Sequence, residues 1–204
     1  MKNFIIGTGG FSKEVYSVMV ENDIPFHGFI GLNETPIMIG SKTYIPILET
    51  NFLNTNDSKK CNLYLGVGNP KILKTIKQKY LNYNFPNLID KNSHIIGEVQ
   101  LGSGNIICSG TVFTTNIKIG CFNVFNLNCT VGHDCEIGSF NVFNPTCCIS
   151  GNVKIKDCNL FGVNSTVLEN LNIESENTIG AMALVTKNID TCNSTYIGIP
   201  AKRK

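Results

Sequence analysis

The second half of the chain carries a hydrophobic residue at every sixth position. The series begins at Ile95 and ends at Val185, and all sixteen positions are aliphatic or phenylalanine, without an insertion or a skip. The following residue is often a glycine or an asparagine, as at Gly102 and Asn126. A period of six fits neither an amphipathic helix nor an alternating strand. It predicts short strands joined by tight corners, with one large side chain per side pointing inward.

Three such sides make one turn, so residues that are three hexapeptides apart stack at the strand spacing of about 4.8 Å. Residues 95–185 therefore predict about five turns of a parallel β-helix. The 27 asparagines of the chain fit this prediction, because asparagine tolerates the left-handed backbone conformation of tight turns.

Residues 1–85 lack the repeat and are predicted as a separate α/β unit. Asn69 is a candidate N-cap directly before Pro70, which a helix tolerates in its first turn. The first predicted helix, 12–22, buries Val15, Val18 and Met19. The expected strands are 3–6, 26–30 and 63–67, and the second expected helix is 70–81.

A glycine-rich turn, Gly7 to Gly10, lies between the first strand and the first helix. Such a turn either holds a phosphate or nucleotide at the helix N-terminus or only lets the helix pack closely on the sheet. Gly31-Leu32-Asn33 follows the second strand, so no acidic residue stands ready for a ribose hydroxyl. We therefore expect nucleotide binding without nicotinamide chemistry.

Composition narrows the class of protein further. The chain has 204 residues, 42% of them hydrophobic, and a formal net charge of +2, which gives no reason to expect nucleic acid or an anionic membrane as partner. No apolar run approaches the roughly 20 residues of a membrane span. The apolar start, Phe4 to Gly7, is too short for a signal peptide, so a cytoplasmic location is expected.

Nine cysteines raise the question of disulfides or a metal site. Their number is odd, no Cys-x-x-Cys pair occurs, and no export signal is expected. Cys129, His133 and Cys135 lie close enough in sequence for a metal site to be considered. Buried thiols that act as small hydrophobic residues are the better interpretation, and no metal is expected.

His133 is the only histidine within the regular coil, and it follows the inward Val131 by two positions, on a corner. Asp134 beside it can fix the imidazole tautomer and raise its basicity. Gly151, one predicted turn further on, would stack over His133 without a side chain and leave room for a substrate. The residues alone leave two interpretations open, a surface histidine and a general base.

A glycine-turn α/β unit joined to a hexapeptide coil resembles the bacterial hexapeptide-repeat sugar acetyltransferases. This family includes nucleotide-amino-sugar N-acetyltransferases, with the UDP-4-amino-sugar enzymes nearest, and sialic acid O-acetyltransferases. The resemblance implies a Rossmann-like sugar-nucleotide domain over 1–85, a left-handed β-helix domain over 86–204, and a homotrimer with active sites between subunits. It is carried by Ile5–Gly10, Leu65–Asn69, Phe125-Asn126, Val131–Gly138, Leu160–Ser165 and Gly198–Lys202.

The resemblance also implies roles for individual residues. His133 would be the general base and Asp134 its partner, and a backbone N–H near Gly151 is our hypothesis for the oxyanion donor. Substrate binding is expected at Gly9, Gly10, Phe11, Gly68 and Asn126. Acetyl-CoA is expected at Val142, Gly151, Val163, Ala181 and Lys187. The basic tail 202–204 either meets the phosphates of CoA or is a solvated terminus.

The implied function is transfer of an acetyl group from acetyl-CoA to the 4-amino group of a nucleotide-linked 4-amino-4,6-dideoxy sugar, for surface glycan biosynthesis. O-acetylation of sialic acid or another sugar hydroxyl is the alternative, and a trimeric scaffold or sensor without catalysis is a third. Phe11 and Gly31-Leu32 depart from the pattern of relatives. UDP, dTDP and GDP therefore all stay open as the nucleotide.

Overall fold

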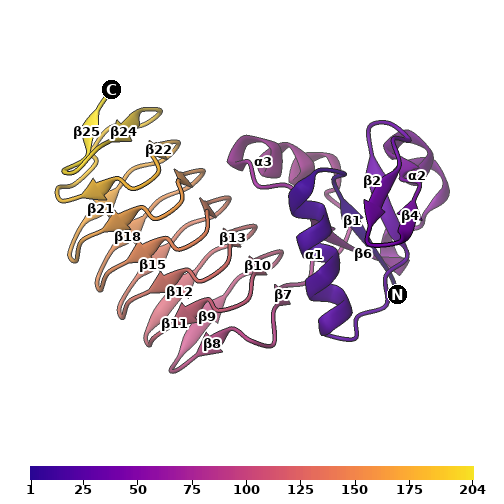
Figure 1. Ribbon diagram of the computed structural model, residues 1–204, viewed down its shortest axis with the longest axis horizontal. Coiled ribbons are helices and arrows are strands. Elements are labelled where there is room, and N and C mark those ends of the chain that lie inside the picture. Colours follow the sequence, from indigo (N-terminus) through magenta and orange to yellow (C-terminus); the bar gives the residue numbers. More distant parts are fainter.

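The computed structural model describes all 204 residues, and it places a front α/β unit against one side of a long coil of short strands (Figure 1). The front unit is a four-stranded parallel sheet of order β5-β2-β1-β6, which matches strands 3-2-1-4 of a doubly wound fold. Its strands are β1 (Lys2–Ile6), β2 (Gly28–Gly31), β5 (Ile47–Leu48) and β6 (Cys61–Leu65), and its helices are α1 (Gly10–Glu21), α2 (Glu49–Thr55) and α3 (Pro70–Lys79). A hairpin of β3 (Ile37–Ile39) and β4 (Lys42–Tyr44) lies between β2 and β5, and a 3-10 turn (Ser58–Lys60) precedes β6.

The two predicted helices, α1 and α3, begin and end close to the predicted residues, whereas α2 was not predicted. Asn69 caps α3 as expected, because its side-chain oxygen accepts hydrogen bonds from the backbone N–H groups of Lys71 and Ile72. The predicted burial of Val15, Val18 and Met19 on α1 is confirmed. α1 starts two residues before the predicted position, since Gly9 already serves as its N-cap.

The coil has three flat faces, and successive strands of each face are one turn apart in sequence and pair in parallel. Face 1 contains β7 (Leu88–Ile89), β10 (Ile106–Ile107), β13 (Val124–Phe125), β16 (Val142–Phe143), β19 (Leu160–Phe161), β22 (Thr178–Ile179) and β24 (Thr195–Ile197). Face 2 contains β8 (His94–Ile95), β11 (Val112–Phe113), β14 (Thr130–Val131), β17 (Cys148–Ile149), β20 (Thr166–Val167) and β23 (Leu184–Val185). Face 3 contains β9 (Val99–Leu101), β12 (Ile117–Ile119), β15 (Glu136–Ile137), β18 (Lys154–Ile155) and β21 (Asn172–Ile173).

The six-residue period therefore describes the coil correctly. The periodic residues from Ile107 to Val185 are buried, and on face 1 the rings of Phe125, Phe143 and Phe161 stack 4.6 and 4.7 Å apart. Ile95 is an exception, with 43% of its surface exposed. It lies in the first turn, or rung, of the coil, before the closed core begins.

The corners of the coil follow the chemistry expected of them. Every sixth residue from Gly104 to Met182 has a positive φ, and asparagine occupies five of these positions. We name the corners by the faces they join: corner 1–2, corner 2–3 and corner 3–1. Tight corners thus account for much of the asparagine in the second half of the chain.

A ladder of buried asparagines runs along the inside of the coil, directly before the strands of face 1. The backbone N–H of each asparagine donates to the side-chain oxygen of the asparagine one turn earlier, at 2.8–2.9 Å. The ladder consists of Asn105, Asn123, Asn141, Asn159 and Asn177. The equivalent positions before face 2 carry Thr, Cys, Cys, Ser and Ala, and those before face 3 are mainly aliphatic.

The three faces differ in what covers them. The outward residues of face 1, such as Ile106, Val124 and Val142, belong to one hydrophobic core with the front unit. Face 3 carries an exposed polar row of Gln100, Lys118, Glu136 and Lys154. Face 2 is partly apolar and uncovered.

The last residues close the end of the coil. β25 (Lys202–Arg203) pairs antiparallel with β24, and the N–H of Lys204 donates to the carbonyl of Thr195. The basic tail is therefore ordered, and its side chains are exposed. No helix has the length and apolar character that crossing a membrane requires.

Candidate functional site

His133 lies at corner 2–3, directly after β14, with 64% of its side chain exposed. The turn that presents it is tight, since Asp134 adopts a φ of +61°. Corner residues point away from the packed interior, so the imidazole faces outward as the sequence predicts.

Asp134 holds this imidazole in one orientation. Its Oδ2 lies 2.6 Å from Nδ1 of His133, and a carboxylate accepts, so Nδ1 carries the proton and Nε2 is left as the basic nitrogen. The other carboxylate oxygen accepts a hydrogen bond from the side-chain amide of Asn116. The amide of Asn116, and next the imidazole, hold the pKa of Asp134 below its usual value.

Asn116 was not among the predicted site residues. It stands one full turn of the coil before Asp134 and therefore occupies the same corner one rung earlier. The stacking rule that identified Gly151 from His133 also identifies Asn116 from Asp134.

Gly151 lies directly beside the imidazole ring, as predicted. A Cβ atom at this position would lie 2.6 Å from Nε2 of His133 and 2.7 Å from its Cε1. The backbone N–H of Gly151 donates no hydrogen bond within the chain, whereas its carbonyl accepts from Asn170. A free backbone donor and a free imidazole nitrogen thus lie side by side on an open corner.

Four of the five residues expected at acetyl-CoA lie at two corners of the coil, and the fifth is Val142. Gly151 and Lys187 share corner 2–3 with His133, because they follow stacked strands of face 2 by two residues. Val163 and Ala181 instead lie exposed at corner 1–2. Asn126, expected at the substrate, also lies at corner 1–2, with β14 between it and His133.

Val142 is a correction to the predicted set. Its side chain is 1% exposed because it points outward from face 1 into the core shared with the front unit. The sequence period identifies outward positions but does not show that another part of the chain covers them. Val142 therefore leaves no surface for a cofactor.

The thiols near His133 point away from it. Cys129 and Cys135 are buried, and their Sγ atoms donate to the carbonyls of Asn144 and Ser150 at 3.3 and 3.1 Å. Burial raises the pKa of the Cys135 thiol, which disfavours the thiolate that a metal ion would need. All nine cysteines are unpaired.

The front unit has a cavity of about 420 Å³ at the carboxyl ends of β1, β2 and β6. This is the edge at which open parallel sheets bind ligands. The cavity is lined by the ends of the strands and by one side of α3: Ile6, Gly7, Thr8, Ile30, Gly31, Leu32, Asn33, Glu49, Val67, Ile72, Thr75, Ile76 and Lys79.

Of Gly7, Gly9, Gly10 and Gly68, only Gly7 lines this cavity; the other three do not line it, although they follow the lining residues Thr8 and Val67 in sequence. Gly7 has a φ of +120°, and a Cβ there would lie 2.7 Å from the carbonyl of Gly66, so the fold itself requires a glycine. Gly9, Gly10 and Gly68 have open space where a Cβ would be. Packing does not explain these three glycines, so close approach of a ligand to the backbone remains a reason for them.

Two charged residues of the cavity were missed in the sequence. Glu49 follows β5 and accepts hydrogen bonds from Lys79 Nζ and, at 3.0 Å, from the hydroxyl of Tyr80. The carboxylate absent after β2 is thus supplied by the neighbouring strand. Glu49 and Lys79 are far apart in sequence, and no local motif links them.

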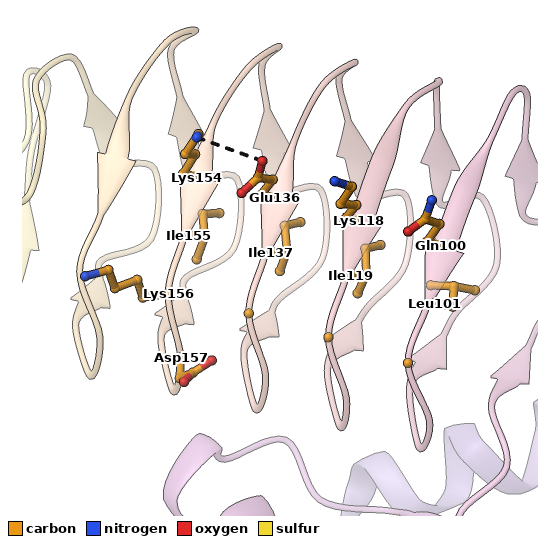
Figure 2. Close-up of a pocket in the computed structure, with 13 residues that line it drawn as sticks. Gln100, Leu101, Lys118, Ile119, Glu136, Ile137, Lys154, Ile155, Lys156 and Asp157 are labelled. Carbon is orange, nitrogen blue, oxygen red and sulfur yellow. Dashed lines mark ion pairs between the residues drawn. The ribbon is translucent and has the colours of Figure 1, made fainter.

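A larger cavity, about 670 Å³, lies along face 3 and contains none of the predicted residues. Figure 2 shows its surface as the row Gln100, Lys118, Glu136 and Lys154, with an ion pair between the last two. This row has no imidazole and no free nucleophile. Corner 2–3, which has an imidazole with a carboxylate partner, is therefore the better candidate for a reactive site.

Solved structures confirm the fold. No protein-family model matches the sequence, and no curated protein is detectably similar to it. PerB from Caulobacter crescentus, solved with CoA and GDP-perosamine, superposes over all of this chain and 97% of its own, with a TM-score of 0.91 and 21% identity. The acetyltransferase domain of PglB from Neisseria gonorrhoeae gives 0.90 and 24%, covering all of this chain and 99% of that domain.

WeeI from Acinetobacter baumannii matches along the whole of both chains, with a TM-score of 0.85 and 26% identity. The parallel faces and few helices fit the β-helix that the resemblance implies. The chain therefore has the fold of the bacterial hexapeptide-repeat sugar acetyltransferases along its entire length.

Proposed function

We propose that this protein transfers an acetyl group from acetyl-CoA to the amino group of a nucleotide-linked 4-amino-4,6-dideoxy sugar in the cytoplasm. The observation that carries the proposal is the arrangement at corner 2–3 on this fold. His133 presents a free Nε2 beside the open Gly151, and Asp134 fixes its tautomer. PerB, of the same fold, was crystallised with CoA and a nucleotide-linked amino sugar, GDP-perosamine.

In the proposed reaction, Nε2 of His133 takes a proton from the sugar amine as the nitrogen attacks the thioester carbonyl. The new C–N bond forms, the C–S bond breaks, and the proton passes from the imidazolium to the departing sulfur of CoA. The unpaired N–H of Gly151 is the candidate donor to the oxyanion that forms in between. Asp134 stabilises the imidazolium at the stage when it carries the extra proton.

We propose that the nucleotide binds the front cavity and that its phosphates meet the turn at Gly9 and Gly10. Helix α1 begins there, and the backbone N–H groups at a helix N-terminus favour the binding of an anion. Phe11 and Gly68 border the same loops. The front unit would then act as a Rossmann-like nucleotide-binding domain. The likeness to the sugar acetyltransferase fold also supports a left-handed β-helix for the coil.

A homotrimer would complete the site. Val163, Ala181 and Asn126 lie at a different corner from His133, so a second coil is needed to bring the two sets together. Face 1 is covered and face 3 is charged, which leaves face 2 as the contact between copies. The 40% exposure of Leu127 at corner 1–2 supports a contact there.

The test is mass spectrometry of the products formed from acetyl-CoA and a panel of acceptors. The panel contains UDP-, dTDP- and GDP-linked 4-amino sugars and free sialic acid. We expect one acetyl group on an amino sugar and a loss of at least about 100-fold in the rate of His133→Ala. Lys118→Ala is the control, because Lys118 is exposed on face 3, away from the proposed contact between copies, and forms no ion pair.

Two results would contradict the proposal. If His133→Ala acetylates the amino sugar within threefold of the wild-type rate, the histidine is not the base. If only sialic acid gains an acetyl group, the acceptor is a hydroxyl and the N-acetyltransferase assignment is wrong.

A further inference from the structure

Two phenylalanines occupy corner positions that disfavour large side chains. Phe122 and Phe140 lie at corner 3–1 with a φ of +61°, a conformation that in general favours glycine or asparagine; Gly104, Cys158 and Glu176 occupy the same corner in other turns. The left-handed conformation costs about 1–2 kcal/mol for a residue with a Cβ. Such strain persists where surrounding contacts determine the conformation, so the contacts of these rings are informative.

Both rings point toward the front unit. They stack on each other at 5.3 Å with an interplanar angle of 12°, and Phe122 also packs edge-on against Phe85, at 5.1 Å. Phe85 belongs to the segment that joins α3 to the coil. Gly104, one rung earlier, leaves room for the Phe122 ring, because a Cβ there would lie 2.8 Å from it. The aromatic cluster is thus the joint between the front unit and corner 3–1.

Lys77 of α3 lies against the aromatic rings of this joint. Its Nζ lies 5.5 Å from the ring centroids of both Phe85 and Phe122, within the range of cation–π attraction. Lys77 is half-buried, whereas the other lysines of α3 are exposed, and it forms no ion pair. The two ring faces are therefore the principal electrostatic partners of its ammonium group.

The opposite side of α3 forms a wall of the front cavity. Thr75 and Lys79 line the cavity, and each lies two residues from Lys77, about 160° around the helix. α3 is therefore wedged between the cavity and the coil, and Figure 1 shows it on the side of the front unit that faces the coil. A shift of the joint is therefore transmitted to the cavity wall, because both are formed by sides of the same helix.

We propose that Lys77 is a positioning residue: its contact with Phe85 and Phe122 sets α3 against the coil and thereby sets the shape of the nucleotide cavity. Lys77 does not touch the ligand and acts only through the helix. This proposal rests on the proposed function of the cavity, and it adds a residue on the far side of the helix to those that determine nucleotide affinity.

The test measures nucleoside diphosphate binding by calorimetry with UDP, dTDP and GDP. We expect Lys77→Met to weaken binding of the best nucleotide by about three- to tenfold, because the side chain keeps its length and loses its charge. Lys77→Arg keeps a cation over the rings and should stay within twofold. Lys74→Met removes an exposed charge from the same helix and should also stay within twofold.

Two further measurements separate positioning from general destabilisation. In steady-state kinetics, Lys77→Met should raise the KM for the nucleotide sugar and leave the KM for acetyl-CoA within twofold. In a double-mutant cycle, Lys77→Met should weaken nucleotide binding less in the Phe122→Leu background than in the wild type, because one of the two rings is gone and only Phe85 remains.

The outcomes distinguish this inference from the proposed function. If wild-type protein binds a nucleotide and Lys77→Met binds it within twofold, the inference is wrong and the function stands. Equal losses in Lys77→Met and Lys77→Arg would also overturn it, since the arginine keeps the cation. If the wild-type protein binds none of the three nucleotides, the proposed function fails and the inference fails with it.

Discussion

Replacing Gly151 with alanine tests the geometry of the reactive corner with a single methyl group. The added Cβ would lie 2.6 Å from Nε2 of His133, whereas ordinary van der Waals contact begins at about 3.4 Å. The imidazole must therefore move by about 0.8 Å. A ring that moves this far is displaced from the orientation in which its Nδ1 lies 2.6 Å from Asp134.

A displacement of about 1 Å at a catalytic group can lower a rate by about 100-fold, so we expect a loss of this order in kcat/KM for acetyl transfer. The fold should be unaffected, because Gly151 does not require a positive φ and alanine can adopt its backbone conformation. We expect the melting temperature to remain within about 2 °C of the wild-type value, which is typical of a surface substitution.

The assay is product formation followed by mass spectrometry, with acetyl-CoA and the acceptor identified from the panel. Ser150→Ala is the matched control, because it adds no atom and removes a hydroxyl that makes no hydrogen bond. An alanine variant at position 151 that keeps a third or more of the wild-type kcat/KM would refute the reasoning, since His133 could then work from a displaced position.

Two further predictions concern hydrogen bonds along the coil. Asn116→Ala should raise the pKa of Asp134 toward its usual value, which carboxyl carbon NMR can follow; an unchanged pKa would contradict the role given to the amide. The depressed pKa stabilises the folded state above a pH of about 4, and this contribution is lost as the pH falls through the folded-state pKa. Asn141→Ala should lower the free energy of unfolding in urea by about 2–4 kcal/mol, because the N–H of Asn159 loses its acceptor in a buried site. A loss no larger than that of the exposed Asn172→Ala would speak against the ladder.

The coil could be predicted from the sequence because its rules are local and repeat. One inward residue in six and three sides to a turn place Gly151 beside His133 without further information. The same arithmetic identifies Asn116, although only after Asp134 is seen to need a second partner. Asn69 was predictable for a similar reason, since a cap depends on the next three residues only.

The contacts between distant segments could not be predicted in this way. Val142 has the same pattern as an exposed outward residue, and only the docking of the front unit buries it. Glu49 and Lys79 meet because the residue after β5 and one side of α3 line the same cavity. Phe122 and Phe140 contradict the local preference of their corner, and their conformation depends on Phe85 and Lys77 across the joint.

The buried asparagine ladder has a consequence for how the chain finds its register while it folds. Sixteen similar hexapeptides could pair with a shift of one hexapeptide and still place a large apolar side chain inward. Such a shift would set Asn123 against Thr111 or Val99 in place of Asn105, and the backbone N–H of Asn123 would lose the amide oxygen that accepts from it in a dry interior. Only shifts of a whole turn satisfy every amide, and those leave whole turns of chain without a place to pair. The ladder thus destabilises misregistered pairings that a purely hydrophobic repeat would tolerate.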